Sequence, residues 1–123
     1  MKSLKPHEED LTLCTYCPSL CRHACPVATA EARDTVSPWG LMSVAAHVME
    51  KRIRLSQDLA EVLYHCTGCG ACTEACKHSV PVARTLVDAR AEVVARGLAP
   101  VGAEAFVHRF KNTVSAKRAT GHA

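Results

Sequence analysis

Residues 66–76 read CTGCGACTEAC, in which the cysteines follow the spacing C-x2-C-x2-C-x3-C. The four are Cys66, Cys69, Cys72 and Cys76. Spacers this short let three thiolates reach three corners of one iron–sulfur cube, and the fourth cysteine of such a run ligates a second cluster. Gly68 and Gly70 lie between the cysteines and permit the close backbone approach and the unusual φ values that a cluster-binding loop needs. The stretch therefore predicts a 4Fe–4S site and one-electron chemistry.

A related run lies upstream, where residues 14–26 read CTYCPSLCRHACP. Its cysteines are Cys14, Cys17, Cys21 and Cys25. The spacing, C-x2-C-x3-C-x3-C-P, has one residue more than the downstream run, between Cys17 and Cys21. Together the two runs supply the eight thiolates that two 4Fe–4S clusters need. The irregular spacing leaves open whether the first motif holds a full cube or a 3Fe–4S variant.

The two runs are expected to exchange their last cysteines, because the fourth cysteine of each run ligates the other cluster in two-cluster ferredoxins. The first predicted ligand set is Cys14, Cys17, Cys21 and Cys76. The second is Cys66, Cys69, Cys72 and Cys25. This exchange would tie the two halves of the chain together and bring the clusters within range for fast electron transfer. No catalytic residue is predicted, since the chain offers no acid–base pair, nucleophile triad or phosphate-binding loop.

Zinc and disulfide bonds are the alternatives to iron–sulfur clusters. Paired C-x2-C knuckles form four-cysteine zinc sites, but a third closely spaced cysteine would then be unused. A secreted disulfide framework is disfavoured because residues 1–10, MKSLKPHEED, lack the apolar core of a signal peptide. His23, His65 and His78 adjoin the cysteines. The cysteines already complete two ligand sets, so we expect these histidines near the clusters or on the surface rather than as ligands.

The composition predicts one small cytoplasmic domain whose folding depends partly on bound metal. The 123 residues are 48% hydrophobic but only 4% aromatic, which gives a thin core. No apolar run is long enough for direct membrane insertion. The formal charge is +3, but eight ligand thiolates and two oxidised cubes of about +4 together would bring it near −1. Nucleic acid is therefore not an expected partner.

Helix caps and apolar stripes of period 3.6 predict four helical segments. Three of them begin at Ser37-Pro38, Ser56 and Pro81, and the third stops at Gly97. The fourth carries a stripe around Phe106 and Phe110, which is either core or a docking face for a partner. No segment shows strand alternation, so the predicted fold is all-α.

The chain resembles a known family at three places: CTGCGACTEAC at 66–76, SPWGLM at 37–42 and VPVARTLVDAR at 80–90. These stretches are similar to the α-helical ferredoxin domain. That domain occurs in the iron–sulfur subunits of heterodisulfide reductase and of glycolate, lactate and anaerobic glycerol-3-phosphate dehydrogenases. The resemblance implies two 4Fe–4S clusters and a ligand role for all eight cysteines. The chain departs from the family at Lys77, where proline is usual, at the lengthened first motif, and in lacking a Cys-Cys-Gly module.

The chain is expected to have three parts: a flexible N-terminal lead over 1–11, a two-cluster α-helical ferredoxin domain over 12–100, and a C-terminal helix with a frayed tail over 101–123. The resemblance covers the second of these parts. The expected function is that of an iron–sulfur electron-transfer subunit that relays single electrons within a larger oxidoreductase complex, rather than a complete enzyme. The expected partner is a separate oxidoreductase subunit, either a Cys-Cys-Gly-module protein or a flavoprotein. An iron–sulfur redox sensor, a zinc-stapled interaction module and a mobile electron carrier remain as alternatives.

Overall fold

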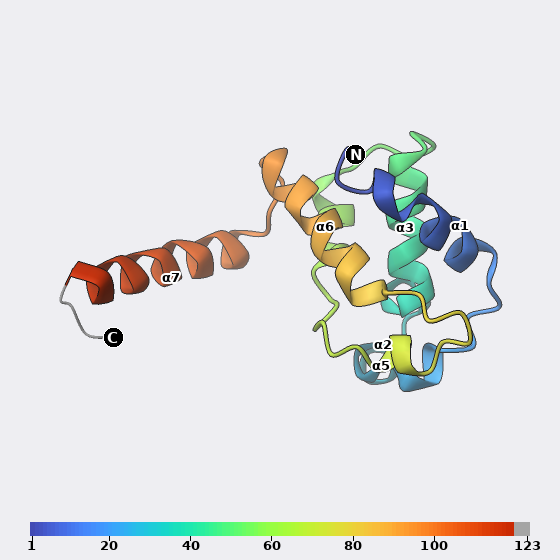
Figure 1. Cartoon of the computed structure of the whole chain (residues 1–123). Coiled ribbons are helices and arrows are strands. Elements are labelled where there is room, and N and C mark those ends of the chain that lie inside the picture. The colour runs from blue at the N-terminus through green and yellow to red at the C-terminus, as the bar shows by residue number, and fades with distance from the viewer. Residues whose placement is uncertain (120–123) are drawn as a thin grey trace.

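Every regular element in residues 1–119, the part of the chain that the computed structural model describes, is helical (Figure 1). The short 3-10 turns are η1 (Lys5–His7), η2 (Arg22–Ala24) and η3 (Asp34–Val36). The α-helices are α1 (Glu8–Tyr16), α2 (Pro26–Glu31), α3 (Pro38–Met49), α4 (Gln57–Leu63), α5 (Ala71–Glu74), α6 (Val82–Ala95) and α7 (Val101–Ala119). The prediction of an all-α fold is confirmed.

The segment Ser37–Gly40 fixes the start of the central helix α3. Ser37 is the predicted N-cap, and its Oγ accepts a hydrogen bond from the Gly40 N–H at 3.1 Å. Pro38 occupies the first turn, where its missing N–H costs nothing. Trp39 donates its indole N–H to the Thr15 carbonyl at 3.2 Å, which ties α3 to the first cysteine run. The residues of this segment therefore either define the first turn of α3 or connect it to the first cysteine run.

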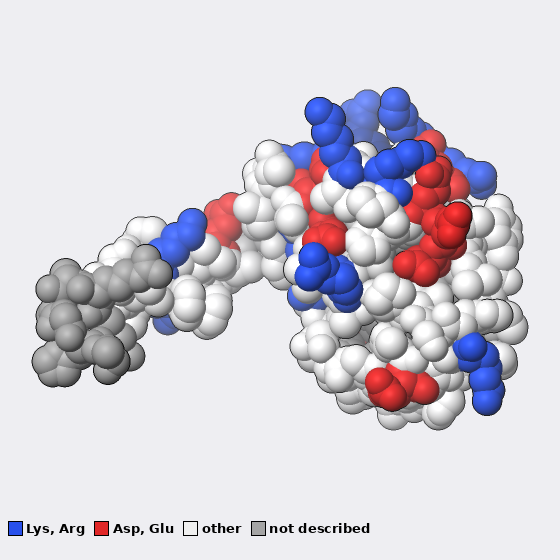
Figure 2. Space-filling view, in the orientation of Figure 1, with Lys and Arg blue, Asp and Glu red and all other residues white. Residues whose placement is uncertain are grey.

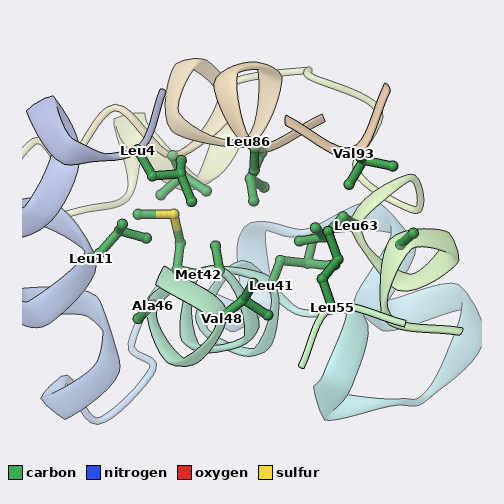
Figure 3. Close-up of a cluster of buried hydrophobic side chains, with 14 of the residues drawn as sticks. Leu4, Leu11, Leu41, Met42, Ala46, Val48, Leu55, Leu63, Leu86 and Val93 are labelled. Atoms are coloured by element: carbon green, nitrogen blue, oxygen red, sulfur yellow. The ribbon is translucent and has the colours of Figure 1, made fainter. Parts of the chain in front are cut away.

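The hydrophobic core is built around α3, which packs against α1, α4 and α6. Its buried side chains include Leu41, Met42, Ala45, Ala46 and Val48. Figure 3 shows Met42 directed toward Leu4 and Leu11, while Leu41 lies toward Leu63. Because α3 has neighbours on several sides, apolar residues occupy more of its surface than the single stripe that the sequence predicted.

Residues 1–11 differ from the flexible lead that the sequence suggested. They form η1 and the first part of α1, and the side chains of Leu4 and Leu11 are 0% exposed. His7 connects this segment to α6. Its Nε2 lies 2.8 Å from the Asp88 carboxylate, and its Nδ1 lies 3.2 Å from the Thr85 hydroxyl. The polar composition of MKSLKPHEED concealed one buried leucine, Leu4, which anchors the segment together with Leu11, the residue that follows this stretch.

Helix α6 ends where the sequence predicted, at Gly97, which adopts a left-handed φ of 67°. The Leu98 N–H donates to the Val93 carbonyl and the Gly97 N–H donates to the Val94 carbonyl, which together form a Schellman motif. Beyond this stop, α7 projects away from the body of the molecule (Figure 1).

Helix α7 shows that the stripe around Phe106 and Phe110 is not part of the core. The two rings stack with centroids 6.4 Å apart, and their side chains are 62% and 60% exposed. The helix continues as far as Ala119, into the tail that was expected to be frayed. The rest of the predicted tail, 120–123, lies outside the described residues. None of the helices described combines the length and apolarity needed to cross a membrane.

Candidate metal centre

The cysteines of both runs lie in α1, in α5 and in the short turns and loops that connect the helices. Helices α2 and α5 both lie at one end of the molecule (Figure 1). Cys21 and Cys25 flank η2, and η2 packs against α5, which contains Cys72. All eight cysteines lie in the described part of the chain and are free thiols, so none of the disulfides of a secreted framework is present there. The structure therefore places residues that lie some fifty positions apart in sequence around one region, as a two-cluster site requires.

The second predicted ligand set lines a single cavity. Cys25, from the upstream run, faces the same cavity as Cys66, Cys69 and Cys72 from the downstream run. Apolar side chains of α3 and α6, including Leu41 and Leu86, form its walls. The fold thus produces the mixture of upstream and downstream cysteines that the sequence predicted for this set.

The cysteines of the first predicted set lie close enough together to affect one another's pKa values. Burial, and after it the nearby thiols of Cys76, Cys21 and Cys17 in that order, raise the pKa of Cys14 to about 12. The pKa of Cys21 is raised by burial too, with Cys76 again the strongest of its thiol neighbours. Cys76, from the downstream run, therefore lies near Cys14 and Cys21 of the upstream run.

The two sets adjoin each other. Burial raises the pKa of Cys72 to about 11, and the next largest causes are Cys21 of the first set and Cys66 of its own set. Thiols with raised pKa values keep their protons at neutral pH, so metal binding here must release protons. The two predicted ligand sets therefore share one region of the molecule.

Backbone N–H groups point at several of the thiols. The Ala28 N–H donates to Cys25 Sγ at 3.4 Å, and the Gly68 N–H donates to Cys66 Sγ at 3.3 Å. Gly68 has a left-handed φ of 73°, which confirms the predicted need for glycine between the cysteines. Cys69 is exposed, and hydrogen bonds from the Ala71 N–H and then the Thr67 hydroxyl hold its pKa below the ordinary value. Such hydrogen bonds to sulfur set the reduction potential of a bound cluster.

The long helices α3 and α6 both start at this cavity. Pro38 and Leu41 of α3 line it, as do Val82 and Ala83 of α6. The N-terminus of a helix carries a partial positive charge, which stabilises anions placed beside it. Two such ends favour the anionic thiolates of a cluster-loaded site, and only the tertiary packing brings them together.

Ser19 adds an independent sign that a further group belongs beside the first set. It lies in the lengthened spacer between Cys17 and Cys21 and has a left-handed φ of 59°. Its hydroxyl oxygen is buried and has no hydrogen-bond partner among the described residues. A buried hydroxyl without a partner is costly, and a cluster sulfur would be a suitable acceptor. The residues present therefore fit an iron–sulfur cluster.

The arrangement of side chains does not match a mononuclear zinc site. Among the described residues, no three His, Cys, Asp or Glu side chains converge as one metal ion requires. A zinc ion needs its sulfur ligands about 2.3 Å from a single centre. A cube binds each thiolate on a different iron, so its ligands stand farther apart.

The histidines beside the cysteines have other partners or lie on the surface. His23 Nδ1 lies 2.9 Å from the Leu20 carbonyl, and His65 Nδ1 lies 3.1 Å from the Glu61 carbonyl. His78 and Lys77 are exposed. None of these side chains joins a group of potential metal ligands among the residues described.

Arg90 on α6 is a site residue that the sequence analysis missed. Its guanidinium donates to the Leu63 carbonyl at 3.0 Å and to the Cys66 carbonyl, and it stacks over the Tyr64 ring at 5.1 Å. These contacts fix the chain where it enters the downstream cysteine run. Nothing local indicated them beyond the position of Arg90 within the stretch 80–90 that carries the resemblance.

Comparison with known families agrees with this geometry. A family model described as a 4Fe-4S dicluster domain matches residues 10–80, which is more than half of the 123-residue chain and includes every cysteine. No curated protein and no solved structure gives a significant match.

Proposed function

We propose, from the premise that the chain belongs to the 4Fe-4S dicluster domain family, that it is an electron-transfer subunit carrying two 4Fe–4S clusters. Iron–sulfur electron transfer is the general activity of this family. The observation that supports two exchanged clusters is the cavity that Cys25 shares with Cys66, Cys69 and Cys72. One set is Cys14, Cys17, Cys21 and Cys76, and the other is Cys66, Cys69, Cys72 and Cys25.

The chain's own residues would hold, insulate and tune the clusters. A bound 4Fe–4S cluster supplies one-electron oxidation and reduction. Leu41 and Leu86 exclude water from the core side of the second set, while the Gly68 and Ala28 N–H groups donate to its thiols. Cys69, on the exposed side, offers the shortest route to solvent and to a redox partner. The protein needs no acid–base residue for this task, because electrons move without group transfer.

We further propose that the chain works beside a separate oxidoreductase subunit in the cytoplasm, as the iron–sulfur subunits of heterodisulfide reductase do in the family that the chain resembles. A Cys-Cys-Gly-module protein or a flavoprotein is the expected partner. The exposed Phe106 and Phe110 on α7 are compatible with such an assembly.

The first test is to count iron, acid-labile sulfide and zinc per chain after purification without oxygen. About eight irons and eight sulfides would support two cubes, and about seven irons would indicate a three-iron cluster. A colourless protein with zinc and without iron would overturn the proposal.

The exchange of ligands has its own test, in which four single variants are compared by electron paramagnetic resonance after reduction. Cys76→Ala should leave the same residual cluster signal as Cys14→Ala, and Cys25→Ala the same signal as Cys66→Ala. If Cys76→Ala instead matched Cys66→Ala, each run would hold its own cluster and the exchange would be wrong.

A further inference from the structure

A hollow with a basic rim lies where the loop after α3 meets the end of α6. We call it the basic hollow, and its volume is about 340 Å³. Its lining residues are Met1, Val48, Lys51, Arg52, Ile53, Arg54, Leu55 and Arg96. Figure 2 shows Lys and Arg side chains gathered over this end of the molecule, at the top of the view.

The charge of the basic hollow is only partly compensated. No acidic residue is among its lining residues. Arg52 pairs with Glu50 at 2.7 Å, and Arg96 pairs with Glu92 at 3.1 Å. Lys51 and Arg54 have no ion pair among the described residues. Two cations are therefore available to an anionic ligand.

The floor of the basic hollow is apolar. Val48 and Leu55 are buried beneath it, and Ile53 is 38% exposed at its edge. A ligand that fits both the rim and the floor carries negative charges on either side of an apolar side chain. The concave shape suits one segment of a polypeptide chain better than a flat surface such as a membrane.

The basic hollow lies at the opposite end of the body from the thiols. Helix α3 begins at the thiol cavity with Pro38 and leads at its other end to Lys51. Helix α6 runs the same way, from Val82 to the turn that contains Arg96. At 1.5 Å per residue, helices of 12 and 14 residues separate the two sites by about 17–20 Å. A ligand in the basic hollow would leave the exposed Cys69 free.

A structural role accounts for part of this charge but not for all of it. Cations beside the C-terminus of a helix stabilise its dipole, and Lys51, Arg52 and Arg96 follow the ends of α3 and α6 closely. Arg54 lies beyond the last turn of α3, so the helix dipole does not explain it. A solely structural role also leaves unexplained why Arg54 has no ion pair among the described residues while Arg52 and Arg96 each have one.

We propose that the basic hollow binds an acidic segment of a partner protein, with an apolar side chain of that segment on the floor and its carboxylates beside Lys51 and Arg54. The charge of the rim and the apolar floor select this class of ligand. The proposal does not rest on the electron-transfer function, because none of the hollow's residues belongs to the thiol site. In this proposal, the end of the protein that lies away from the clusters binds a partner protein.

The test is to measure binding of a fluorescent, acetylated and amidated peptide, EELEE, to the cluster-loaded protein by anisotropy at low and at physiological salt. The variant Lys51→Glu/Arg54→Glu should weaken binding at least tenfold, and salt should weaken binding to the wild-type protein. Lys51 has a left-handed φ of 60°, which strains lysine and glutamate alike, so the exchange adds no new backbone cost.

The matched control is Lys77→Glu/Lys111→Glu, which changes the net charge equally at two exposed positions outside the hollow. It should keep binding within about twofold. Equal losses in both variants would show that only net charge matters and would overturn the proposal, as would no binding to wild-type protein. Binding to vesicles with phosphatidylserine but not to the peptide would also overturn it. Iron content and circular dichroism of each variant establish that it is folded.

Discussion

Replacing Gly40 by alanine should force apart two elements that meet at the start of α3. A Cβ atom on Gly40 would lie 2.2 Å from the Asp34 carbonyl oxygen and 2.6 Å from the Thr35 carbonyl oxygen. Both are backbone atoms of η3, so no side chain can turn away to make room. The shift would also disturb the N-cap, because Ser37 accepts from the Gly40 N–H and donates to the Asp34 carbonyl at 2.6 Å.

The magnitude follows from three opposing effects. Overpacking of a close contact costs about 1–3 kcal/mol, and a weakened N-cap costs about 1 kcal/mol more. Alanine is the better helix former by about 1 kcal/mol, which offsets the lost cap. The net loss of unfolding free energy is thus about 1–3 kcal/mol. At about 4 °C per kcal/mol for a chain of this size, the melting temperature should fall by about 4–12 °C.

The assay is thermal unfolding of the cluster-loaded protein without oxygen, followed by far-ultraviolet circular dichroism and by the visible absorbance of the clusters. The matched control is Gly102→Ala in α7, where a Cβ would meet nothing within 4 Å. That variant should melt within about 2 °C of wild type, or slightly higher, since alanine favours the helix. If Gly40→Ala melted together with Gly102→Ala, the close contact between η3 and α3 would not exist as described.

Three further predictions test other parts of the structure. Leu4→Ala should lower the unfolding free energy by about 2–5 kcal/mol because the side chain is fully buried. A loss below about 0.5 kcal/mol would instead show that residues 1–11 are the flexible lead that the sequence suggested. Ser19→Ala should lower the reduction potential of the first-set cluster by removing a hydrogen-bond donor while iron content stays unchanged, and an unaltered potential in redox titration would refute that role for the hydroxyl. Burial raises the pKa of Glu92, but hydrogen bonds from Ser3 and Arg96 outweigh it and hold that pKa below the ordinary 4.5. This contact therefore stabilises the fold above pH 4.5 and is lost as the pH falls further, so the difference in melting temperature between wild type and Glu92→Gln should shrink on acidification; a constant difference would contradict the sign of the shift.

Much of the helical framework could be predicted because its signals are local. The N-cap at Ser37 acts on a backbone N–H three residues away, and the stop at Gly97 depends on the left-handed conformation of that one residue. The N-terminal segment could not be assigned in this way. Its polar residues describe the solvent side, while Leu4 is buried by distant parts of the chain. Isolated apolar residues in a polar segment give no periodic signal.

The sequence by itself determined the kind of site and the grouping of its closely spaced cysteines. Spacers of two or three residues can only bring thiolates to one place, so three ligands of each set are defined before the chain folds. Only the tertiary structure decided what stands around them. It placed Cys25 in the cavity lined by the downstream cysteines, and the first residues of α3 and α6 line the same cavity. It also placed Arg90 where its guanidinium donates to the Cys66 carbonyl. At the opposite end of the body, it brought together the residues that line the basic hollow. These arrangements join residues far apart in sequence, and the packing of α1, α4 and α6 around α3, rather than any local preference, fixes their positions.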